Sequence, residues 1–446
     1  MDFQQASEFA LSLARERHER DVDVLVGRNQ SLSIKVLGGK VEKVDQSTSQ
    51  GLGLRVLREG RTGIAYTERM DPEAIERAFL AAGENADLND RTEVEMVERV
   101  PTVPDPETLE LYNPALDDLT LDDLAQFGLA AEEAALAGDP RVKAVPALVV
   151  KRSRGIYQVA SSHGLQYGQE ENSVGAYCSV MLEENGVRKS GGHQWSAREW
   201  APEKGEWLGR EAARKGAALM GARPISGGAL PVVLDEETAP ALLGMYFSGL
   251  SAESVQKGLS RFKDKVGQPV AGESIQLLDD PHRKGAPGSR FLDAEGTPTA
   301  PLPILENGVL RNLFYHVESA RREGRQSTGH AGRGYNGGIG TRSHSLVMNP
   351  GEYDLDALCA LTERCLLITE LEGGAGCNPV SGDISIGVQG FLVENGRRTQ
   401  PVDSVTIAGN FFDLLQNIQA LGDRYQPNLS NRFIPAMLVE GFVLSG

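Results

Sequence analysis

The chain has 446 residues, of which 40% are hydrophobic and 24% charged, a composition typical of a globular protein of two or three domains and not of a disordered or fibrous one. Its 45 Lys and Arg against 62 Asp and Glu give a net charge of -17, and no basic block is long enough to follow a phosphate backbone, so we expect no nucleic-acid partner. The longest uncharged apolar run near the middle of the chain, residues 239–250, is well short of the ~20 residues that span a bilayer, so no membrane span is expected.

The first five residues, Met-Asp-Phe-Gln-Gln, contain neither the basic nor the apolar region of an export signal, so we expect a cytoplasmic protein. The four cysteines include no CxxC pair, which argues against a disulfide scaffold or a zinc ribbon; they are Cys178, Cys359, Cys365 and Cys377. We therefore expect reduced thiols, with Cys359 and Cys365 packed in an apolar segment.

Apolar side chains recur at three- and four-residue steps over residues 3–17, which predicts an amphipathic helix. Four alternating runs follow and predict an antiparallel meander, divided at Gly38-Gly39, Gln50-Gly51 and Glu59-Gly60. Asp71 as an N-cap before Pro72 then predicts a second helix. Residues 1–100 are thus expected to form an N-terminal α+β domain.

Residues 91–118 are acidic and rich in proline without a sustained period, and we interpret them as a linker. Thr120 with Asp123 resembles a capping box, which predicts the start of an alanine-rich helix. Alternating runs and a closing helical period complete a second α+β unit, at residues 144–197 and 203–221. The linker and this unit make up an expected central domain of residues 101–222.

Residues 223–446 mix short strands with a few helices and long Gly- and Pro-rich stretches, which predicts a larger, mixed, β-rich C-terminal domain. Asn-Gly pairs between apolar runs favour the positive φ angles of type I′ turns and predict β-hairpins, at Asn185-Gly186, Asn307-Gly308 and Asn395-Gly396. The fold class expected for the whole chain is α+β.

A glycine-rich loop covers residues 329–340, and its part from Gly332 onward matches the GxGxxG pattern of dinucleotide-binding folds. That pattern needs a helix after the loop, whereas residues 342–348 are typical of a strand, so we reject a dinucleotide site. We expect a structural or flexible loop, or one that borders a cavity, with His330, Gly332 and Gly334 as its candidate residues.

The seven histidines include no pair at the spacing of a helical zinc motif with an intervening glutamate. His18-Glu19 is interpreted as a solvated helix terminus. His330 and His344 lie fourteen residues apart, so only tertiary folding could pair them, and we favour hydrogen-bonded loop histidines. The serines lie in no GxSxG elbow, and no catalytic triad is predicted.

Residues 231–259, a short strand followed by an apolar helical segment, resemble the TldD/PmbA metalloprotease family where its catalytic subunit carries HExxxH. The resemblance aligns Gly244 and Gly249 with the two histidines and Met245 with the glutamate. It extends over essentially the whole chain, and several segments look like the TldE (PmbA) branch, among them residues 327–332, 381–387, 405–410 and 434–441. The C-terminal cysteine that completes the zinc site of the catalytic branch has no counterpart, since no cysteine follows Cys377.

What the resemblance implies is a subunit with no catalytic residue, no metal ligand and no cofactor of its own. Its partner is then a TldD-like subunit that carries HExxxH and the zinc, and their substrates are unfolded peptides, including leader peptides. The family's older name, modulator of DNA gyrase, does not imply DNA contact by so acidic a chain. Two alternatives stay open: a stand-alone binding or regulatory protein that forms a homodimer, and an enzyme with a metal-free site built from residues such as His330, Cys377 or Asp383.

Overall fold

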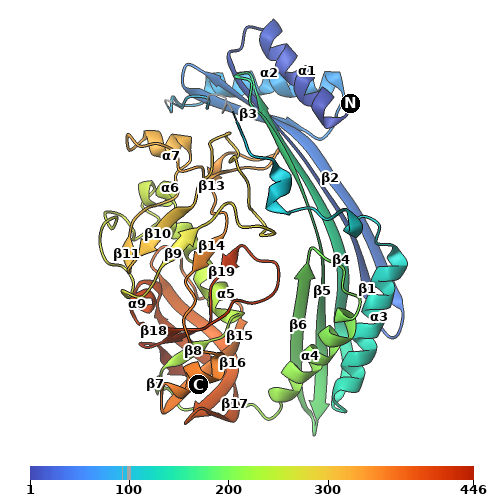
Figure 1. Cartoon of the computed structure of the whole chain (residues 1–446), viewed down its shortest axis with the longest axis vertical. Coiled ribbons are helices and arrows are strands. Elements are labelled where there is room, and N and C mark those ends of the chain that lie inside the picture. The colour runs from blue at the N-terminus through green and yellow to red at the C-terminus, as the bar shows by residue number, and fades with distance from the viewer. Residues whose placement is uncertain (93, 98–101) are drawn as a thin grey trace.

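The N-terminal half of the chain is organised around one antiparallel sheet, sheet A, with the strand order β3-β2-β1-β4-β5-β6. The computed structural model describes residues 1–92, 94–97 and 102–446, and the strands of sheet A run along most of the length of the molecule (Figure 1). The fold class is α+β, as predicted. The strands of this sheet are β1 (Asp21–Val36), β2 (Val41–Arg58), β3 (Arg61–Thr67), β4 (Val142–Ser161), β5 (Gln166–Glu184) and β6 (Val187–Ala197).

The first two expected domains share sheet A, because β1 pairs with β4 over most of its length, beginning with Asp23 opposite Ser161. Part of the expected linker, at 93 and 98–101, lies outside the described residues. The described remainder of that segment forms irregular chain with two short 3₁₀ helices, Pro106–Leu109 and Pro114–Leu116.

Two pairs of helices cover sheet A, one pair at each end (Figure 1). The predicted N-caps are confirmed: Asp71 accepts from the N–H of Ala74 at 3.0 Å, and Thr120 accepts from the N–H of Asp123 at 3.2 Å.

Across the described ranges of the chain, no helix has the length and apolar character needed to cross a membrane. The helices are α1 (Phe3–Glu16), α2 (Pro72–Leu88), α3 (Leu121–Gly138) and α4 (Lys204–Ala218).

The predicted break at Gln50-Gly51 is wrong, since β2 continues through it. The glycines there make room for another part of the chain: a Cβ at Gly51 would lie 2.2 Å from a ring carbon of Tyr335, and one at Gly53 would lie 2.1 Å from the Tyr335 carbonyl oxygen. Glycine inside a strand thus marks a close approach by the glycine-rich loop, and not a turn.

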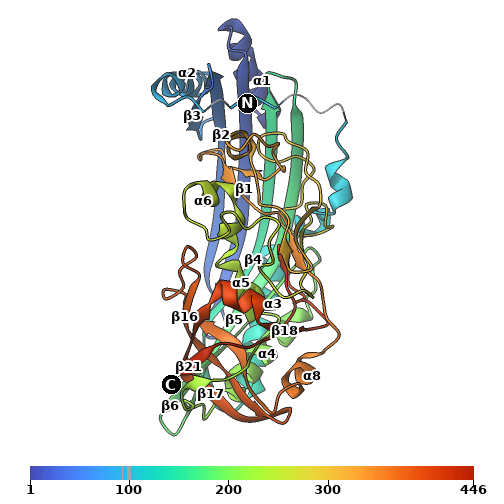
Figure 2. The same ribbon diagram turned by 90° about the vertical axis from the view of Figure 1, so that its left-hand side faces the viewer.

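The C-terminal domain contains an eight-stranded sheet, sheet B, and a five-stranded sheet, and it lies across sheet A in the side view of Figure 2. Cys359 and Cys365 are buried in its core, as predicted. The helices are α5 (Thr238–Gly244), η3 (Phe247–Leu250), α6 (Ala252–Gln256), α7 (Val317–Arg321), α8 (Leu355–Ala360) and α9 (Phe411–Gln416). The strands are β7 (Gly228–Ala229), β8 (Val232–Leu234), β9 (Leu277–Asp279), β10 (Leu302–Glu306), β11 (Val309–Leu310), β12 (Ala331–Gly332), β13 (Gly340–Thr341), β14 (Leu346–Met348), β15 (Arg364–Glu372), β16 (Asp383–Glu394), β17 (Arg397–Asn410), β18 (Ile418–Leu421), β19 (Arg432–Phe433), β20 (Met437–Val439) and β21 (Val443–Ser445).

The three Asn-Gly pairs connect hairpins, as predicted: β5 to β6, β10 to β11, and β16 to β17. In each pair both residues have positive φ, with asparagine at 51° and glycine between 72° and 80°. These are the angles that a type I′ turn requires.

A buried ion network joins sheet A to the C-terminal domain. Arg55 of β2 is 1% exposed and donates from Nε to Asp23 at 2.6 Å and from Nη1 to Glu295 at 2.8 Å. Arg333 of the glycine-rich loop also pairs with Asp23. Glu295 in turn accepts from the N–H of Val317 at 2.9 Å. The loop is therefore docked on the sheet through charges that solvent does not reach.

Candidate functional site

The segment that aligns with the family's zinc motif begins just after β8, where Asp235 binds Thr238, the first residue of α5. The Asp235 carboxylate accepts from the N–H and the hydroxyl of Thr238, each at 2.8 Å. Helix α5 is short, and its apolar residues Leu242 and Leu243 are fully buried. This packing places Gly244 at the last position of α5.

Another side chain fills the space beside Gly244, whereas the space beside Gly249 would admit a Cβ in ordinary contact. A Cβ at Gly244 would lie 2.2 Å from Nη1 of Arg432, so the guanidinium occupies the place that a ligand side chain would need. The same nitrogen donates to the carbonyl of Pro240 at 3.4 Å. A Cβ at Gly249 would meet Ser260 Oγ at 3.4 Å.

These residues do not fit a zinc ion. Zinc in proteins is held by imidazole, thiolate or carboxylate groups, whereas glycine offers no side chain and Met245 offers only a weak thioether. The positive guanidinium of Arg432 beside Gly244 further disfavours a divalent cation. No chemical step can be assigned to a metal at Gly244, Met245 and Gly249.

Within this segment, Tyr246 lies between Cys377 and Asp383. Its hydroxyl donates to the carbonyl oxygen of Asp383 at 2.8 Å, and its ring stacks on Phe411 at 4.7 Å. Burial, with the neighbouring Cys377 thiol, raises the pKa of Tyr246, so its hydroxyl stays protonated. The Asp383 carboxylate accepts a hydrogen bond of 2.6 Å from the hydroxyl of Ser381. The structure thus brings Cys377 and Asp383 to one tyrosine, but places His330 in another cluster.

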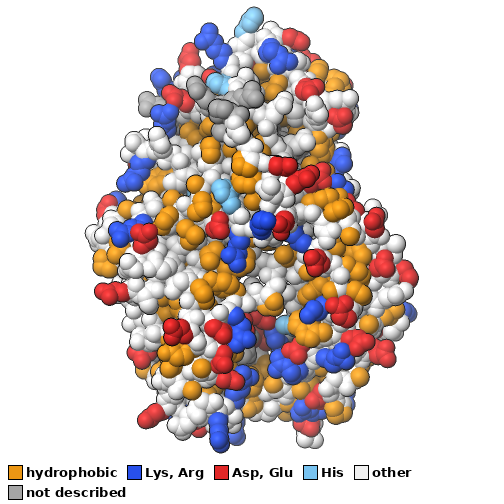
Figure 3. All heavy atoms as spheres, in the orientation of Figure 1, with side chains coloured by type: hydrophobic (Ala, Val, Ile, Leu, Met, Phe, Trp, Pro, Cys, Tyr) orange, Lys and Arg blue, Asp and Glu red, His pale blue; other side chains and the backbone are white. Residues whose placement is uncertain are grey.

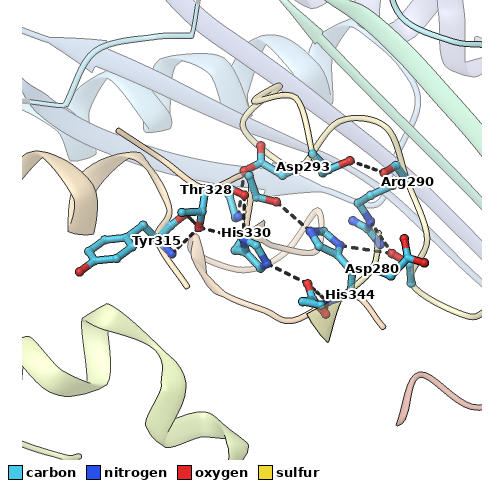
Figure 4. Close-up of polar contacts among 12 residues, drawn as sticks. Asp280, Arg290, Asp293, Tyr315, Thr328, His330 and His344 are labelled. Atoms are coloured by element: carbon cyan, nitrogen blue, oxygen red, sulfur yellow. Dashed lines mark hydrogen bonds and ion pairs between the residues drawn. The ribbon is translucent and has the colours of Figure 1, made fainter. Parts of the chain in front are cut away.

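His330 and His344 do meet, together with Asp279 of β9, in the interior of the C-terminal domain (Figure 4). Their ring centres are 4.8 Å apart. Nε2 of His330 donates to Asp279 Oδ2 at 2.8 Å, and the backbone N–H of His344 donates to the same carboxylate at 3.0 Å. Tertiary folding has therefore paired the two histidines, although the preferred interpretation, hydrogen-bonded loop histidines, also holds.

Asp279, His330 and His344 are a set of side chains that could hold a metal ion. Hydrogen bonds already use their atoms: His344 Nε2 donates to the carbonyl of Gly329 at 2.8 Å, and Thr328 Oγ1 lies 2.9 Å from His330 Nδ1. Burial lowers the pKa of His344 to about 4, so its ring is neutral at pH 7. This arrangement ties three chain segments together, and it needs no ion to do so.

The glycine-rich loop forms a ribbon of β12 and β13 and is followed by no helix, in agreement with the rejected dinucleotide site. The strand predicted over 342–348 is shorter and covers only Leu346–Met348. The chain departs from strand geometry where the His344 N–H turns toward Asp279. Gly332 is tightly packed, with the Arg342 side chain 2.9 Å from its hypothetical Cβ, whereas Gly334 has only Asn336 within 4 Å.

Sequence reasoning missed Asp279 and Arg432. Asp279 carries one weak signal, since it is an acidic residue at the end of a short apolar run. Arg432 lies 188 positions after Gly244 and has no spacing signal, because only tertiary packing brings the two together.

Family models of one group match three consecutive parts of the chain. They describe PmbA/TldA metallopeptidase domain 1 at residues 22–86, the central domain at residues 114–220 and the C-terminal domain at residues 227–446.

Full-length relatives agree with these matches. Metalloprotease PmbA of Escherichia coli O157:H7 is 28% identical over 98% of this chain and 96% of its own length. A metalloprotease TldD homolog of Buchnera aphidicola is 25% identical over 86% of this chain and 81% of its own length. A putative modulator of DNA gyrase from Thermotoga maritima superposes with a TM-score of 0.89 at 28% identity, over 99% of this chain and 100% of its own. TldE of Thermococcus kodakarensis shares the fold, with a TM-score of 0.88 at 23% identity. The match covers 99% of this chain and 100% of the TldE chain.

Proposed function

Because the chain belongs to the PmbA/TldD metallopeptidase family, we propose that it is the zinc-less, non-catalytic subunit of a heteromeric, cytoplasmic TldD/TldE-type protease. The assembly degrades or trims unfolded peptides and leader peptides. Its catalytic half is a TldD-like subunit that carries HExxxH and binds the zinc, while this chain carries no cofactor.

The packing of Arg432 against Gly244 is the observation that carries this proposal. A lost ligand could leave an open position, but here a cation fills it. The two other aligned positions, Met245 and Gly249, offer neither a general base nor a second ligand. The water-activating group must therefore come from another chain.

Similarity to both kinds of relative supports a partner of the same fold. The chain resembles PmbA proteins over nearly its full length and TldD homologs over most of it. Two chains with one architecture can enclose a common space, in which one half supplies the chemistry and the other shapes the site.

The metal content of the isolated chain gives the first test. Elemental analysis after mild chelation should find less than stoichiometric zinc, because the aligned positions hold no ligand. One retained zinc per chain would contradict the proposal. If Asp279→Asn then removed that zinc, the metal would belong to the buried cluster of Asp279, His330 and His344.

Cleavage of an unstructured peptide gives the decisive test. This chain, an HExxxH-bearing relative and their mixture are compared, with a Glu-to-Gln variant of the relative's motif as the inactive control. We expect full activity only in the mixture, and the inactive partner should still form the complex on a sizing column. Cleavage by this chain alone that chelators do not inhibit would favour a metal-free enzyme, and failure to form a complex would favour the homodimeric binding protein.

A further inference from the structure

A cleft of about 470 Å³ separates the end of sheet A from the C-terminal domain. One wall is formed by β6 and α4, and the other by residues around β8, β15 and β16. Figure 3 shows this face of the molecule hollowed between the two halves, with charged side chains of both signs nearby. Gly244, Met245 and Gly249 do not line the cleft, and neither do the two paired histidines.

Strand β6 is the last strand of sheet A, and its outer edge points into the cleft. Asn428 covers part of this edge: its Oδ1 accepts from the N–H of Ser196 at 3.0 Å, and its Nδ2 donates to the carbonyl of Gln194 at 3.3 Å. One side chain thus makes the two hydrogen bonds that a neighbouring strand residue would make.

Alternate residues of an antiparallel strand direct their N–H and C=O groups to the same side. The backbone groups of Ser190 and Gly192 therefore face the outer edge of β6, as do those of Gln194 and Ser196. Of these residues, Gly192 and Gln194 line the cleft. Beyond them, Lys189 pairs with Asp403 of β17 and marks the far end of the open stretch. Within the described part of the chain, Ser190 and Gly192 are thus two free strand positions, and they lie between two contacts that hold the domains together.

The side chains around this edge leave a negative charge and a polar nitrogen without partners. His193 is 9% exposed, and its Nδ1, 3.7 Å from Glu237 Oε1, makes no hydrogen bond within the described structure. Glu370 is exposed at the surface of the cleft and has no ion-pair partner among the described residues. Partial desolvation, with the nearby Glu372, raises its pKa. The two cations of α4 that line the cleft are already paired, Lys215 with Glu237 at 2.7 Å and Arg214 with Glu211 at 2.8 Å.

We propose that this cleft binds an extended peptide segment as a short added strand on β6, with a lysine or arginine side chain of that segment beside Glu370. The main chain of the peptide pairs with Gly192 and Ser190, in the manner of β-strand addition. Glu370 then gains a direct ion-pair partner, whereas the nearby Lys215 is paired with Glu237. This inference rests on the proposed function, because the site would give the non-catalytic subunit a place to hold unfolded substrate.

Fluorescence anisotropy with the full-length chain tests the site. The probe is a fluorescein-labelled octapeptide of alternating valine and lysine, compared with one in which glutamate replaces lysine. Glu370→Gln should weaken binding of the lysine peptide by up to about fivefold, as expected for loss of an exposed ion pair. Glu363→Gln is the matched control, because Glu363 is exposed one position before β15 and lines no part of the cleft.

A second probe separates main-chain pairing from charge. The same lysine peptide, N-methylated at alternate residues, keeps its charge but cannot complete the ladder, so it should bind much more weakly. Equal binding of the lysine peptide and its N-methylated form would overturn the inference. An equal loss of affinity for the lysine peptide in Glu370→Gln and Glu363→Gln would also overturn it.

The peptide-binding test can fail independently of the cleavage test of the proposed function. Cleavage by the mixed subunits without peptide binding to this chain would refute only the proposed binding site in the cleft. Peptide binding without any complex between the subunits would support the cleft and refute the proposed function.

Discussion

Replacing Arg55 by leucine removes the cation at the centre of the buried network. The guanidinium contacts Asp23 and Glu295 at 2.6 and 2.8 Å, and leucine leaves both carboxylates without it. Loss of one partner from a buried ion pair costs about 3–5 kcal/mol. Because Asp23 keeps Arg333 and Glu295 keeps the N–H of Val317, we expect the lower end, about 3 kcal/mol in the free energy of unfolding.

Urea unfolding followed by tryptophan fluorescence measures this loss, because all three tryptophans lie between residues 195 and 207, in the region of sheet A. The matched control is Arg17→Leu, which breaks a pair with Glu76 whose two side chains are each 43% exposed. That change should cost no more than about 1 kcal/mol. If Arg55→Leu is no more destabilised than Arg17→Leu, the buried network does not join the domains in the way described.

Gly244→His alone should acquire no zinc, because Met245 and Gly249 add no further ligand and the Arg432 guanidinium lies beside the new side chain; one zinc per chain in the dialysed variant would contradict this reasoning. Gly53→Ala should lower the free energy of unfolding by about 1–3 kcal/mol, since the new Cβ would meet the Tyr335 carbonyl oxygen, and an unchanged melting curve would exclude that contact. Burial raises the pKa of Asp235 from 3.8 to about 6, so the folded state binds the carboxyl proton more tightly than the unfolded state does. The protonated carboxyl group therefore stabilises the fold below about pH 4, and this stabilisation is lost as the pH rises through about 6. Asp235→Asn, which cannot ionise, should therefore gain melting temperature relative to the unmodified chain over that range, and parallel pH profiles would refute the assignment.

Helix caps and Asn-Gly turns are local sequence signals, and they correctly predict the helices and hairpins that they begin or connect. The N-caps Asp71 and Thr120 placed two helices correctly, and Asn185-Gly186 placed a hairpin, because each acts through neighbouring backbone groups. Gly51 was misread as a turn because its cause, the ring of Tyr335, lies 284 positions later in the chain.

The candidate site was predictable only in part, for the same physical reason. Alignment pointed to Gly244 and Gly249, but it gave no sign that Arg432 fills the space beside the first of them. The sequence identifies His330 and His344 as a pair that only tertiary folding can join, but it gives little sign of Asp279, which binds both. Contacts between distant segments have no periodicity that a single sequence could display.

The pairing of β1 with β4 also has a consequence for synthesis of the protein on the ribosome. The two strands meet at Lys35 and Val149, which are separated by 114 positions. At the usual elongation rates of about 5–20 residues per second, β1 waits on the order of ten seconds for its second neighbour to emerge. During that interval the nascent meander exposes an unpaired strand, a state open to wrong pairing with other chains. Chaperone binding to a stalled nascent chain should therefore be strongest before residue 161 has left the exit tunnel and should fall once β4 is free to pair.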